Sequence, residues 1–292
     1  MTRPSGKRFR AALVQLRSGR DAEANVGHAE ALIRRAAEGG AAYVQTPENT
    51  ALMELKPELV IEAAETEEAS APLARFRALA SALGIFLHVG SLAIRLDGVR
   101  VANRSYLIDP EGRIAARYDK LHLFDVDLAG GESYRESDHA RPGATAIVVE
   151  LPFGRLGLSI CYDLRFAALY RALALAGAEF IAVPAAFTKQ TGEAHWHVLI
   201  RARAIETGTF VLAAAQGGLH ENGRSTFGHS LIVSPWGEIL AEGGEAPGVV
   251  FADIDLAEAA EARARIPALK HGRDFAVAVA EPPPASSGKK AS

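Results

Sequence analysis

The sequence contains a single cysteine, Cys161, among its 292 residues. One thiol excludes an internal disulfide bond and any metal site that needs several thiolate ligands. A chain without disulfides fits a reducing compartment, so we expect a cytoplasmic protein. This scarcity leaves one question open, which is whether the lone thiol packs in the core or reacts.

Excess charge of one sign and long apolar runs are also missing. The 32 basic and 35 acidic residues leave a formal net charge of −3, which provides no basic field for nucleic acid or an anionic membrane. Arg17 and Arg20 end the first apolar run too early for a signal peptide. No run approaches the roughly 18 apolar residues of a membrane-spanning helix. We therefore expect neither nucleic-acid nor membrane partners.

Several cofactor and metal motifs are absent as well. The sequence has neither a Walker A loop nor a G-x-G-x-x-G turn, and "GLSIC" lacks the final glycine of the serine-hydrolase elbow. His195 and His197 form the densest histidine pair, but their i,i+2 spacing on a predicted helix points them apart. These absences predict a protein that uses no metal ion and no organic cofactor.

Predicted strands and helices alternate along most of the chain. Apolar runs bounded by glycine or proline predict strands, and apolar residues at helical spacing predict helices, one capped by Asp21 and another closed by Gly84. This alternation, with hairpins in between, indicates an α/β layered fold with a mixed sheet. Strands and hairpins are predicted over residues 9–16, 42–47, 85–96, 101–109, 113–124, 146–161, 180–187, 209–216, 229–243 and 248–256, helices over 21–37, 72–83, 164–176, 193–206 and 255–265, and a Gly-, Asp- and Glu-rich loop over 125–145.

Two segments of the sequence resemble each other. "SYLIDPEGRI" (105–114) and "SLIVSPWGEI" (230–239) share the form strand, Pro-x-Gly turn, strand. They are either matching hairpins in two related halves of the chain or two independent uses of a common turn.

Three chemically reactive residues follow predicted strands: Glu48, Lys120 and Cys161. In open α/β sheets, ligands bind where strands end, so we expect the three side chains to converge on one crevice. For Cys161 two interpretations remain open. Free cysteines usually pack in cores, but this one stands at a predicted strand-to-helix junction, where N–H groups and the helix dipole favour a thiolate.

The charged residues have ordinary interpretations too, because most Glu and Lys side chains are solvated. Glu48 follows an apolar strand, and burial there would raise its pKa and make it a proton acceptor. Lys120 precedes the apolar "LHLF" and would stabilise a developing oxyanion. Glu136 lies in the acidic loop, where a solvated side chain is the default expectation.

The segments "TPEN", "RYDKLHLFD" and "GLSICYDLRF" contain Glu48, Lys120 and Cys161 in this order. They resemble the Glu–Lys–Cys signature of the nitrilase superfamily of carbon–nitrogen hydrolases, and the resemblance extends from "ALVQL" to "VVFADIDL". "FTKQTGEAHWH", "GRSTFGHS" and "PWGEIL" are similar to the Nit-type amidase branch, most of all to the deaminated glutathione amidases. One departure is Thr46, where relatives usually carry a bulky apolar residue.

This resemblance implies a four-layer α-β-β-α sandwich with mixed sheets over residues 1–282, followed by a disordered tail over 283–292. It implies that Glu48 is the general base, that Lys120 stabilises the oxyanion and that Cys161 attacks the substrate. It also places Glu136 in the site as a fourth catalytic residue. The subunits would pack helix layer against helix layer in a homo-oligomer, either a dimer or a dimer of dimers.

The function that the resemblance implies is a cofactor-independent amidase. It would hydrolyse a small primary amide that carries a carboxylate, similar to deaminated glutathione, to an acid and ammonia through a thioester on Cys161. Alternatives are an omega-amidase acting on 2-oxoglutaramate or 2-oxosuccinamate, and a hydrolase of nitriles or N-carbamoyl compounds. A catalytically silent binding or scaffold protein with the same fold is the alternative outside enzymology.

Residues near the predicted nucleophile are candidates for substrate binding. The backbone N–H of Tyr162 would join Lys120 at the oxyanion, and Phe187 and Thr188 would form walls of the pocket. Structural roles are expected for His195 and Trp196.

A carboxylate on the substrate requires a cation in the pocket. Arg165, four residues after Cys161, and Lys189 are the two candidates in the sequence. Arg165 has an equally good structural interpretation, as an ion-pair partner of Asp163 or Glu206.

Overall fold

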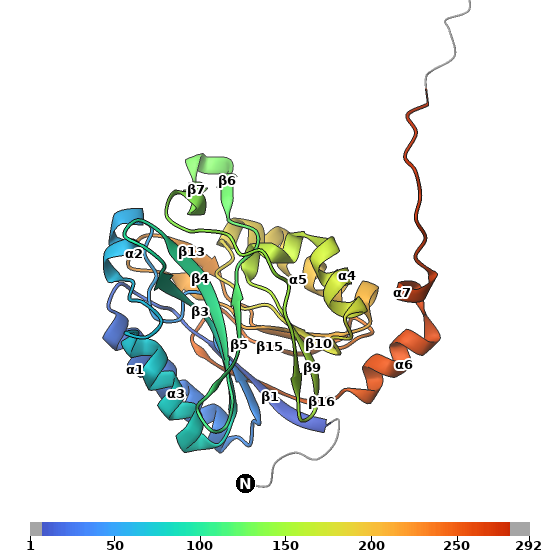
Figure 1. Cartoon of the computed structure of the whole chain (residues 1–292), viewed down its shortest axis with the longest axis horizontal. Helices are drawn as coiled ribbons and strands as arrows, with labels where there is room; N and C mark the ends of the chain where they lie inside the picture. Colours follow the sequence, from blue (N-terminus) through green and yellow to red (C-terminus); the bar gives the residue numbers. More distant parts are fainter. Residues whose placement is uncertain (1–7, 281–292) are drawn as a thin grey trace, which may run out of the picture.

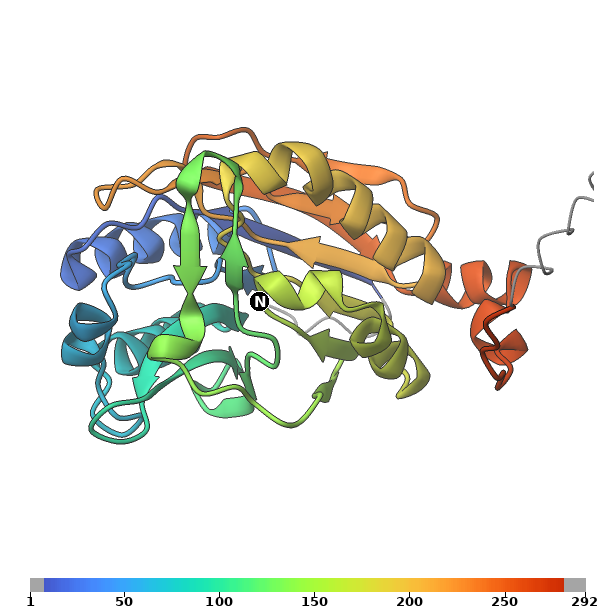
Figure 2. The same ribbon diagram turned by 90° about the horizontal axis from the view of Figure 1, so that it is seen from above.

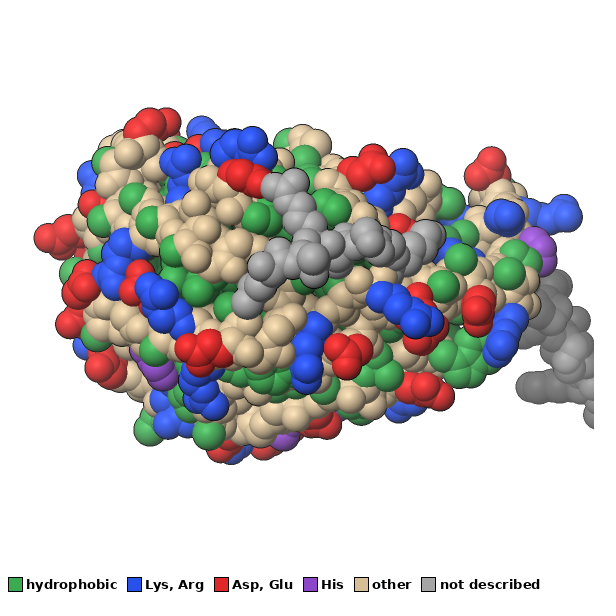
Figure 3. All heavy atoms as spheres, turned by 90° about the horizontal axis from the view of Figure 1, so that it is seen from below, with side chains coloured by type: hydrophobic (Ala, Val, Ile, Leu, Met, Phe, Trp, Pro, Cys, Tyr) green, Lys and Arg blue, Asp and Glu red, His purple; other side chains and the backbone are tan. Residues whose placement is uncertain are grey.

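The computed structural model describes residues 8–280 of the chain (Figure 1). The predicted tail over 283–292 lies outside the described residues. Within the described residues, no helix is both long enough and apolar enough to span a membrane. The face seen in Figure 3 carries interspersed acidic and basic side chains, as the small net charge suggests.

Two six-stranded sheets form the centre of the molecule. The first has the order β16-β1-β2-β3-β4-β5 and the second the order β15-β14-β11-β10-β9-β8. In each, three parallel strands are flanked by one antiparallel strand on one side and an antiparallel pair on the other. The strands of the first sheet are β1 (Arg8–Gln15), β2 (Tyr43–Gln45), β3 (Phe86–Arg95), β4 (Val101–Ile108), β5 (Ile114–Asp119) and β16 (Gly248–Asp255), and those of the second are β8 (Val148–Leu151), β9 (Gly154–Leu158), β10 (Phe180–Ala182), β11 (Phe210–Ala213), β14 (Leu231–Val233) and β15 (Ile239–Glu242).

Helices cover the outer faces of both sheets. The helices α1 (Ala22–Glu38) and α3 (Ala71–Leu83) pack on the first sheet, and α4 (Ala167–Leu175) and α5 (Lys189–Thr207) pack on the second (Figures 1 and 2). This arrangement is the predicted α-β-β-α sandwich with mixed sheets. Two further helices, α6 (Ala257–Arg265) and α7 (Ala268–His271), extend from the second-sheet end of the molecule.

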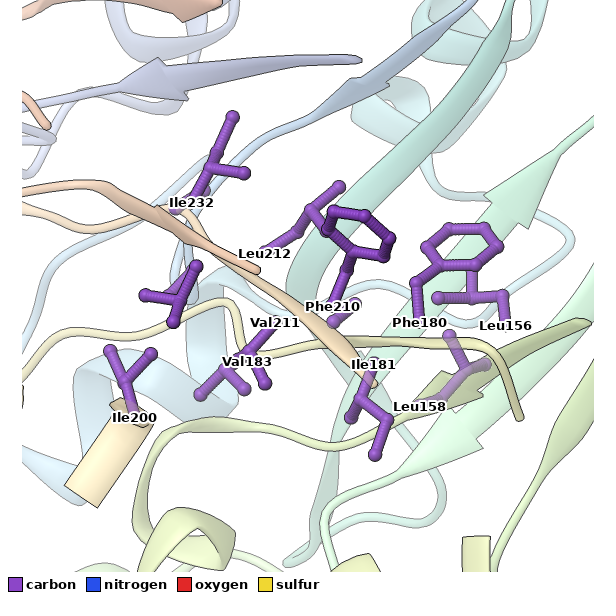
Figure 4. Close-up of a cluster of buried hydrophobic side chains, with 14 of the residues drawn as sticks. Leu156, Leu158, Phe180, Ile181, Val183, Ile200, Phe210, Val211, Leu212 and Ile232 are labelled. Atoms are coloured by element: carbon purple, nitrogen blue, oxygen red, sulfur yellow. The ribbon is translucent and has the colours of Figure 1, made fainter. Parts of the chain in front are cut away.

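The core includes the second sheet and the space between the two sheets. Figure 4 shows apolar side chains of β9, β10, β11 and β14, with Ile200 of α5 on the helix side. On the other side Phe180 meets Tyr43 of the first sheet edge to face, with ring centroids 5.7 Å apart. Burial on both faces explains why these strands are continuous apolar runs in the sequence.

The two similar segments of the sequence form matching hairpins. The pairs β4–β5 and β14–β15 occupy corresponding positions in the two sheets. Gly112 and Gly237 both have positive φ, 78° and 85°, which a Pro-x-Gly turn requires of its glycine. The N–H groups of these glycines donate to Asp109 O and Ser234 O, each at 2.9 Å. The two segments are therefore matching hairpins, one in each sheet.

Local capping signals correctly predicted several helix ends. The Asp21 carboxylate accepts hydrogen bonds from the first N–H groups of α1, and Gly84 closes α3 in the left-handed conformation. The helix α5 begins four residues earlier than predicted, at Lys189, because the Thr188 hydroxyl caps it by accepting from Thr191 N–H.

Three local predictions were wrong in detail. The helix predicted over 164–176 divides into a 3₁₀ turn, Cys161–Arg165, and the shorter helix α4. The predicted loop over 125–145 contains a small hairpin of β6 (Asp125–Asp127) and β7 (Ser133–Arg135), which projects from the body of the molecule (Figure 1). Helix α2 (Pro57–Ala63) was not predicted, because its one buried residue, Val60, produces no periodic pattern.

Candidate active site

The carboxyl ends of three strands bring Glu48, Lys120 and Cys161 together. Glu48 follows β2, Lys120 follows β5, and Cys161 follows β9. The Lys120 ammonium lies 2.8 Å from Glu48 Oε1, and the Cys161 thiol lies beside the Glu48 carboxylate. All three side chains are buried. Residues more than 100 positions apart in the sequence therefore form one cluster, as predicted from their positions at strand ends.

Glu136 completes this cluster from the opposite side of the ammonium. Its Oε2 accepts hydrogen bonds from Lys120 Nζ at 2.8 Å and from the N–H of Phe124 at 2.7 Å. The side chain is only 14% exposed. The default expectation of a solvated loop charge was wrong, because the loop folds back over the end of the first sheet.

Asn103, on β4, was not predicted as part of the cluster. Its Nδ2 donates to Glu48 Oε1 and to Glu136 Oε1, each at 2.9 Å. The amide thus joins two carboxylates that would otherwise repel each other. The signal in the sequence was one amide among the three consecutive polar residues 103–105 of β4, which does not reveal what the side chain contacts.

The backbone at Cys161 is held in an unusual conformation. Its φ is 47°, in the left-handed region that non-glycine residues seldom adopt. The Cys161 N–H donates to Pro184 O at 2.9 Å. The buried Asp163 carboxylate accepts from Ile160 N–H at 2.9 Å and from the Tyr118 hydroxyl at 2.7 Å. These bonds hold the turn that points the sulfur toward Glu48 and Lys120.

Burial and charge shift the pKa values within the cluster. Burial by itself would lower the pKa of Lys120, but the Glu136 and Glu48 carboxylates raise it well above its usual range. Burial would raise the pKa of Glu48, but the Lys120 ammonium lowers it below its ordinary value. Burial raises the pKa of the Cys161 thiol, and the nearby Glu48 charge raises it further. The resting cluster therefore contains an ammonium, a carboxylate and a neutral thiol.

Two electrostatic expectations from the sequence are corrected by this result. Glu48 was expected to have a raised pKa from burial, which neglected Lys120. Cys161 was expected to be a thiolate favoured by a helix dipole. The turn at Cys161 is a 3₁₀ turn of five residues, too short for a large dipole, and the Glu48 carboxylate acts on the thiol more strongly than the Lys120 ammonium does.

A cavity of about 320 Å³ opens onto the cluster. Glu48, Lys120, Glu136 and Cys161, the four predicted catalytic residues, all line it. A second, very small cavity of about 10 Å³ also contacts Cys161. The four predicted substrate-binding residues line this small cavity, namely Tyr162, Arg165, Phe187 and Thr188. The predicted catalytic residues and the predicted substrate-binding residues thus line two cavities that both contact Cys161.

A model of the carbon–nitrogen hydrolase family matches residues 10–264. The chain belongs to the carbon–nitrogen hydrolase family. The predicted enzyme class is therefore confirmed. A deaminated glutathione amidase of Yersinia enterocolitica is 40% identical over 91% of this chain and 94% of its own length. The human deaminated glutathione amidase is 38% identical over 90% of this chain and 81% of its own length.

Solved structures of the same family have the same fold. The Caenorhabditis elegans NitFhit protein superimposes with a TM-score of 0.85 at 37% identity over 92% of this chain, which spans 66% of that fusion protein. Saccharomyces cerevisiae Nit3 gives 0.80 at 27% identity over 89% of this chain and 95% of its own. A mutant amidase of Nesterenkonia sp. AN1, with the acetamide moiety of fluoroacetamide added covalently at its active site cysteine, gives 0.77 at 27% identity over 89% and 95%.

The two cations predicted for a substrate carboxylate have different surroundings in this carbon–nitrogen hydrolase. The Arg165 guanidinium lies over the Phe187 ring, 5.2 Å from its centroid, and 3.3 Å from His195 Nδ1. Lys189 forms an exposed ion pair with Glu245 at 2.8 Å and lines neither cavity. Lys189 is therefore not a pocket residue.

The structural alternative for Arg165 was also wrong. Asp163 is paired with His122, whose Nδ1 lies 2.6 Å from the carboxylate. Glu206 is paired with Arg203 at 2.8 Å. Trp196 has the expected structural role, since it is fully buried and its indole N–H donates to His229 O.

One group of side chains in the hydrolase has the composition of a metal site. His197 Nε2 and His229 Nδ1 lie 2.9 and 2.8 Å from Glu242 Oε1. Among residues 8–280 this is the one group of three or more His, Cys, Asp or Glu residues close enough to hold an ion, and it lies outside both cavities. His195 points elsewhere, toward Arg165, as the i,i+2 spacing predicted.

Proposed function

We propose that this carbon–nitrogen hydrolase is an amidase that cleaves a linear, carboxylate-bearing amide through a thioester on Cys161. The observation that supports this most is the buried cluster of Glu48, Lys120 and Glu136 against the one thiol, on the wall of a cavity. Buried ionised groups are a costly way to build a core, which favours a chemical role.

The first step forms the thioester. The Cys161 sulfur attacks the amide carbonyl while Glu48, which lies beside the thiol, takes its proton. A neutral thiol beside an ionised carboxylate has the protonation states that this transfer needs. The Lys120 ammonium and the backbone N–H of Tyr162 stabilise the oxyanion.

The second half of the reaction restores the enzyme. Protonated Glu48 gives its proton to the leaving nitrogen as the C–N bond breaks, and the amine departs. Glu48 then takes a proton from water, whose oxygen attacks the thioester. As the C–S bond breaks, Glu48 gives this proton to the leaving sulfur, so the acid departs and the neutral thiol and the carboxylate are restored. Glu136 and Asn103 keep Lys120 and Glu48 in position throughout, through the hydrogen bonds that they make to both.

The leaving group distinguishes the two main candidate substrates. Several relatives are deaminated glutathione amidases, and glutathione is a tripeptide whose amides are peptide bonds. A substrate derived from it would therefore release an amine. A primary omega-amide, such as 2-oxoglutaramate, would release ammonia. The deaminated peptide is the first choice, because the relatives with this name are about 40% identical over most of the chain.

The cysteine adduct in the Nesterenkonia amidase supports the covalent step. A thiol that forms a bond to a small amide reagent is what the proposed mechanism requires of Cys161. The chain contains no other cysteine that could take this role.

The decisive experiment measures product formation and the covalent intermediate together. We expect the enzyme to hydrolyse deaminated glutathione or an omega-amide, and an acyl adduct on Cys161 to be visible by intact-mass spectrometry. The variant Cys161→Ala should lose at least about 10³-fold in kcat while it keeps its circular dichroism spectrum. Turnover unchanged in that variant would exclude the mechanism. No turnover of amides, nitriles or carbamoyl compounds, with no adduct, would favour the scaffold alternative.

We also propose that the enzyme is a cytoplasmic homo-oligomer. A nucleophilic thiol must stay reduced, which suits the cytoplasm. Large apolar side chains are more than half exposed on the outer helix layer and in the extended segment after α7, and a second copy would cover them. These residues are Leu175, Val198, Ile205, Phe275, Val277 and Val279. Sedimentation analysis should show a dimer or a larger even assembly, and a chain truncated after Arg273 should dissociate more readily.

A further inference from the structure

Three residues on the wall of the cavity beside Cys161 each keep one side-chain atom without a partner. Among residues 8–280, three buried side-chain atoms lack a hydrogen-bond partner: Asn103 Oδ1, His139 Nδ1 and Arg224 Nε. All three residues line the 320 Å³ cavity. These atoms are themselves buried, but a buried polar atom without a partner is costly, so their grouping marks one polar stretch of the cavity wall whose hydrogen bonds are incomplete.

The assignment of the Asn103 oxygen follows from its neighbours. Its Nδ2 must face Glu48 and Glu136, because two carboxylates can only accept hydrogen bonds. The Oδ1 atom is therefore the acceptor without a partner. Arg224 presents the opposite chemistry, because its Nε–H is a donor.

Arg224 lies where the hairpin of β12 (Gly217–Leu219) and β13 (Ser225–Phe227) approaches the β6–β7 hairpin. It directly precedes β13, and its guanidinium lies 5.1 Å from the ring centroid of Tyr134, which belongs to β7. One of its terminal N–H groups donates to Ala186 O, which fixes the guanidinium. Arg224 lines both the 320 Å³ cavity and the small cavity, as does Cys161. A group bound to Arg224 would therefore be close to the reacting carbon.

Arg224 also lacks the acidic partner that the other cations of the large cavity have. Lys120 lies between Glu48 and Glu136, and Arg135 pairs with Asp127 at 2.8 Å. No ion pair joins Arg224 to an acid among the described residues. Its charge nevertheless reaches the cluster, since it helps to lower the pKa of Glu48.

The charge of the catalytic cluster makes such a cation necessary for an anionic substrate. Two carboxylates and one ammonium leave the cluster with a net charge of −1, which repels a carboxylate. The guanidinium of Arg224 on the same cavity offsets this repulsion. It can also bind a carboxylate through two parallel N–H donors.

Resting on the amidase function proposed above, we infer that Arg224 is the residue that binds the substrate carboxylate. Arg165 is the less suitable cation, because its guanidinium stacks on Phe187 and Tyr162 and contacts His195. Arg224 is thus a specificity residue, and it selects anionic amides over neutral amides of the same length.

The test compares matched substrates in which a methyl group replaces the carboxylate. Glutaramate and pentanamide place this difference on the acyl side, and N-pentanoylglycine and N-ethylpentanamide place it on the leaving group. We expect wild type to prefer the anionic member of at least one pair. Arg224→Gln should raise KM for that member about 10- to 100-fold and leave the neutral member within about threefold, and Arg224→Lys should lose less. The pair that responds identifies the side of the scissile bond that carries the carboxylate.

Control variants separate this role from a structural one. Lys189→Gln, outside both cavities, should leave both pairs unchanged. An equal loss for anionic and neutral substrates in Arg224→Gln would mean that Arg224 only positions Ala186, and would overturn the inference. The same holds if wild type shows no preference, or if Arg165→Gln abolishes the preference and Arg224→Gln does not. No hydrolysis of any amide by wild type would instead contradict the proposed function.

Discussion

The two sheets share one strand order but contribute different groups to the site. Strands β2 and β10 occupy equivalent positions, and β2 is followed by Glu48 whereas β10 is followed by the apolar Ala185 and Ala186. The two loops meet, and Ala186 N–H donates to Glu48 Oε2 at 3.0 Å. The first half of the chain thus provides the carboxylates and the ammonium of the cluster, and the second half provides the thiol, the backbone donor of Ala186 and Arg224. The two sheets can share the catalytic groups in this way because the carboxyl ends of their equivalent strands meet at the same cluster.

The faces between the sheets differ in the same way. By strand register, Tyr43 and His88 of the first sheet correspond to Phe180 and Leu212 of the second. His88 Nδ1 lies 2.9 Å from the Tyr43 hydroxyl, and its Nε2 lies 2.6 Å from Ser105 Oγ. The first sheet therefore buries a polar network where the second buries hydrocarbon, and only the first should respond to acid.

The largest effect on stability and activity should follow from removing the Lys120 ammonium, which joins the two carboxylates of the cluster. Lys120→Met would leave Glu48 and Glu136 buried without a counter-charge, so we expect a loss of about 3–5 kcal/mol in unfolding free energy. The loss of an oxyanion donor should lower kcat by about 10²–10³-fold. Urea denaturation and steady-state kinetics measure the two effects. If the unfolding free energy of the variant lies within about 1 kcal/mol of the wild-type value, the cluster is not ionised as described.

A smaller effect should come from the pH dependence of stability, to which only the interior face of the first sheet should contribute. Burial lowers the pKa of His88 to about 3, whereas the unfolded chain takes up this proton near the ordinary value of 6.5. Between these values the unfolded state binds more protons, so stability is complete above about pH 6.5 and falls as the pH drops toward 3.

The matched variant for this prediction is His88→Gln, which cannot titrate. Its unfolding free energy should change less steeply than that of wild type between about pH 6 and 4, by up to about 1.4 kcal/mol per pH unit. Above pH 7 the two slopes should agree. Equal slopes at acid pH would show that His88 is protonated in the folded protein.

The smallest effect should come from an ion pair on the surface of the second half. Lys189→Gln removes the exposed pair with Glu245, whose side chains are 49% and 47% exposed. We expect a change within about 0.5 kcal/mol in stability and none in kcat or KM, because solvent screens such a pair. A large loss of activity would indicate that Lys189 contacts the substrate. It would also weaken the inference that Arg224 binds the substrate carboxylate.

Much of the fold was predictable, because its signals are local. Asp21 and Gly84 mark helix ends through bonds within a few residues, and apolar runs mark strands buried on both faces. Glu48, Lys120 and Cys161 were predictable as a site because each follows a strand. Helix α2 and the β6–β7 hairpin were missed, since short and mostly exposed elements carry little hydrophobic pattern.

The sequence by itself determined the order of most of the elements and the identity of the one thiol. Only the tertiary structure decided that Asn103 joins two carboxylates, that Lys189 lies outside the pocket and that Arg224 lies inside it. It also decided the protonation states of Glu48 and Cys161. Periodicity and caps depend on neighbours in the chain, whereas burial and Coulomb interactions depend on distances in space between residues that the chain keeps far apart.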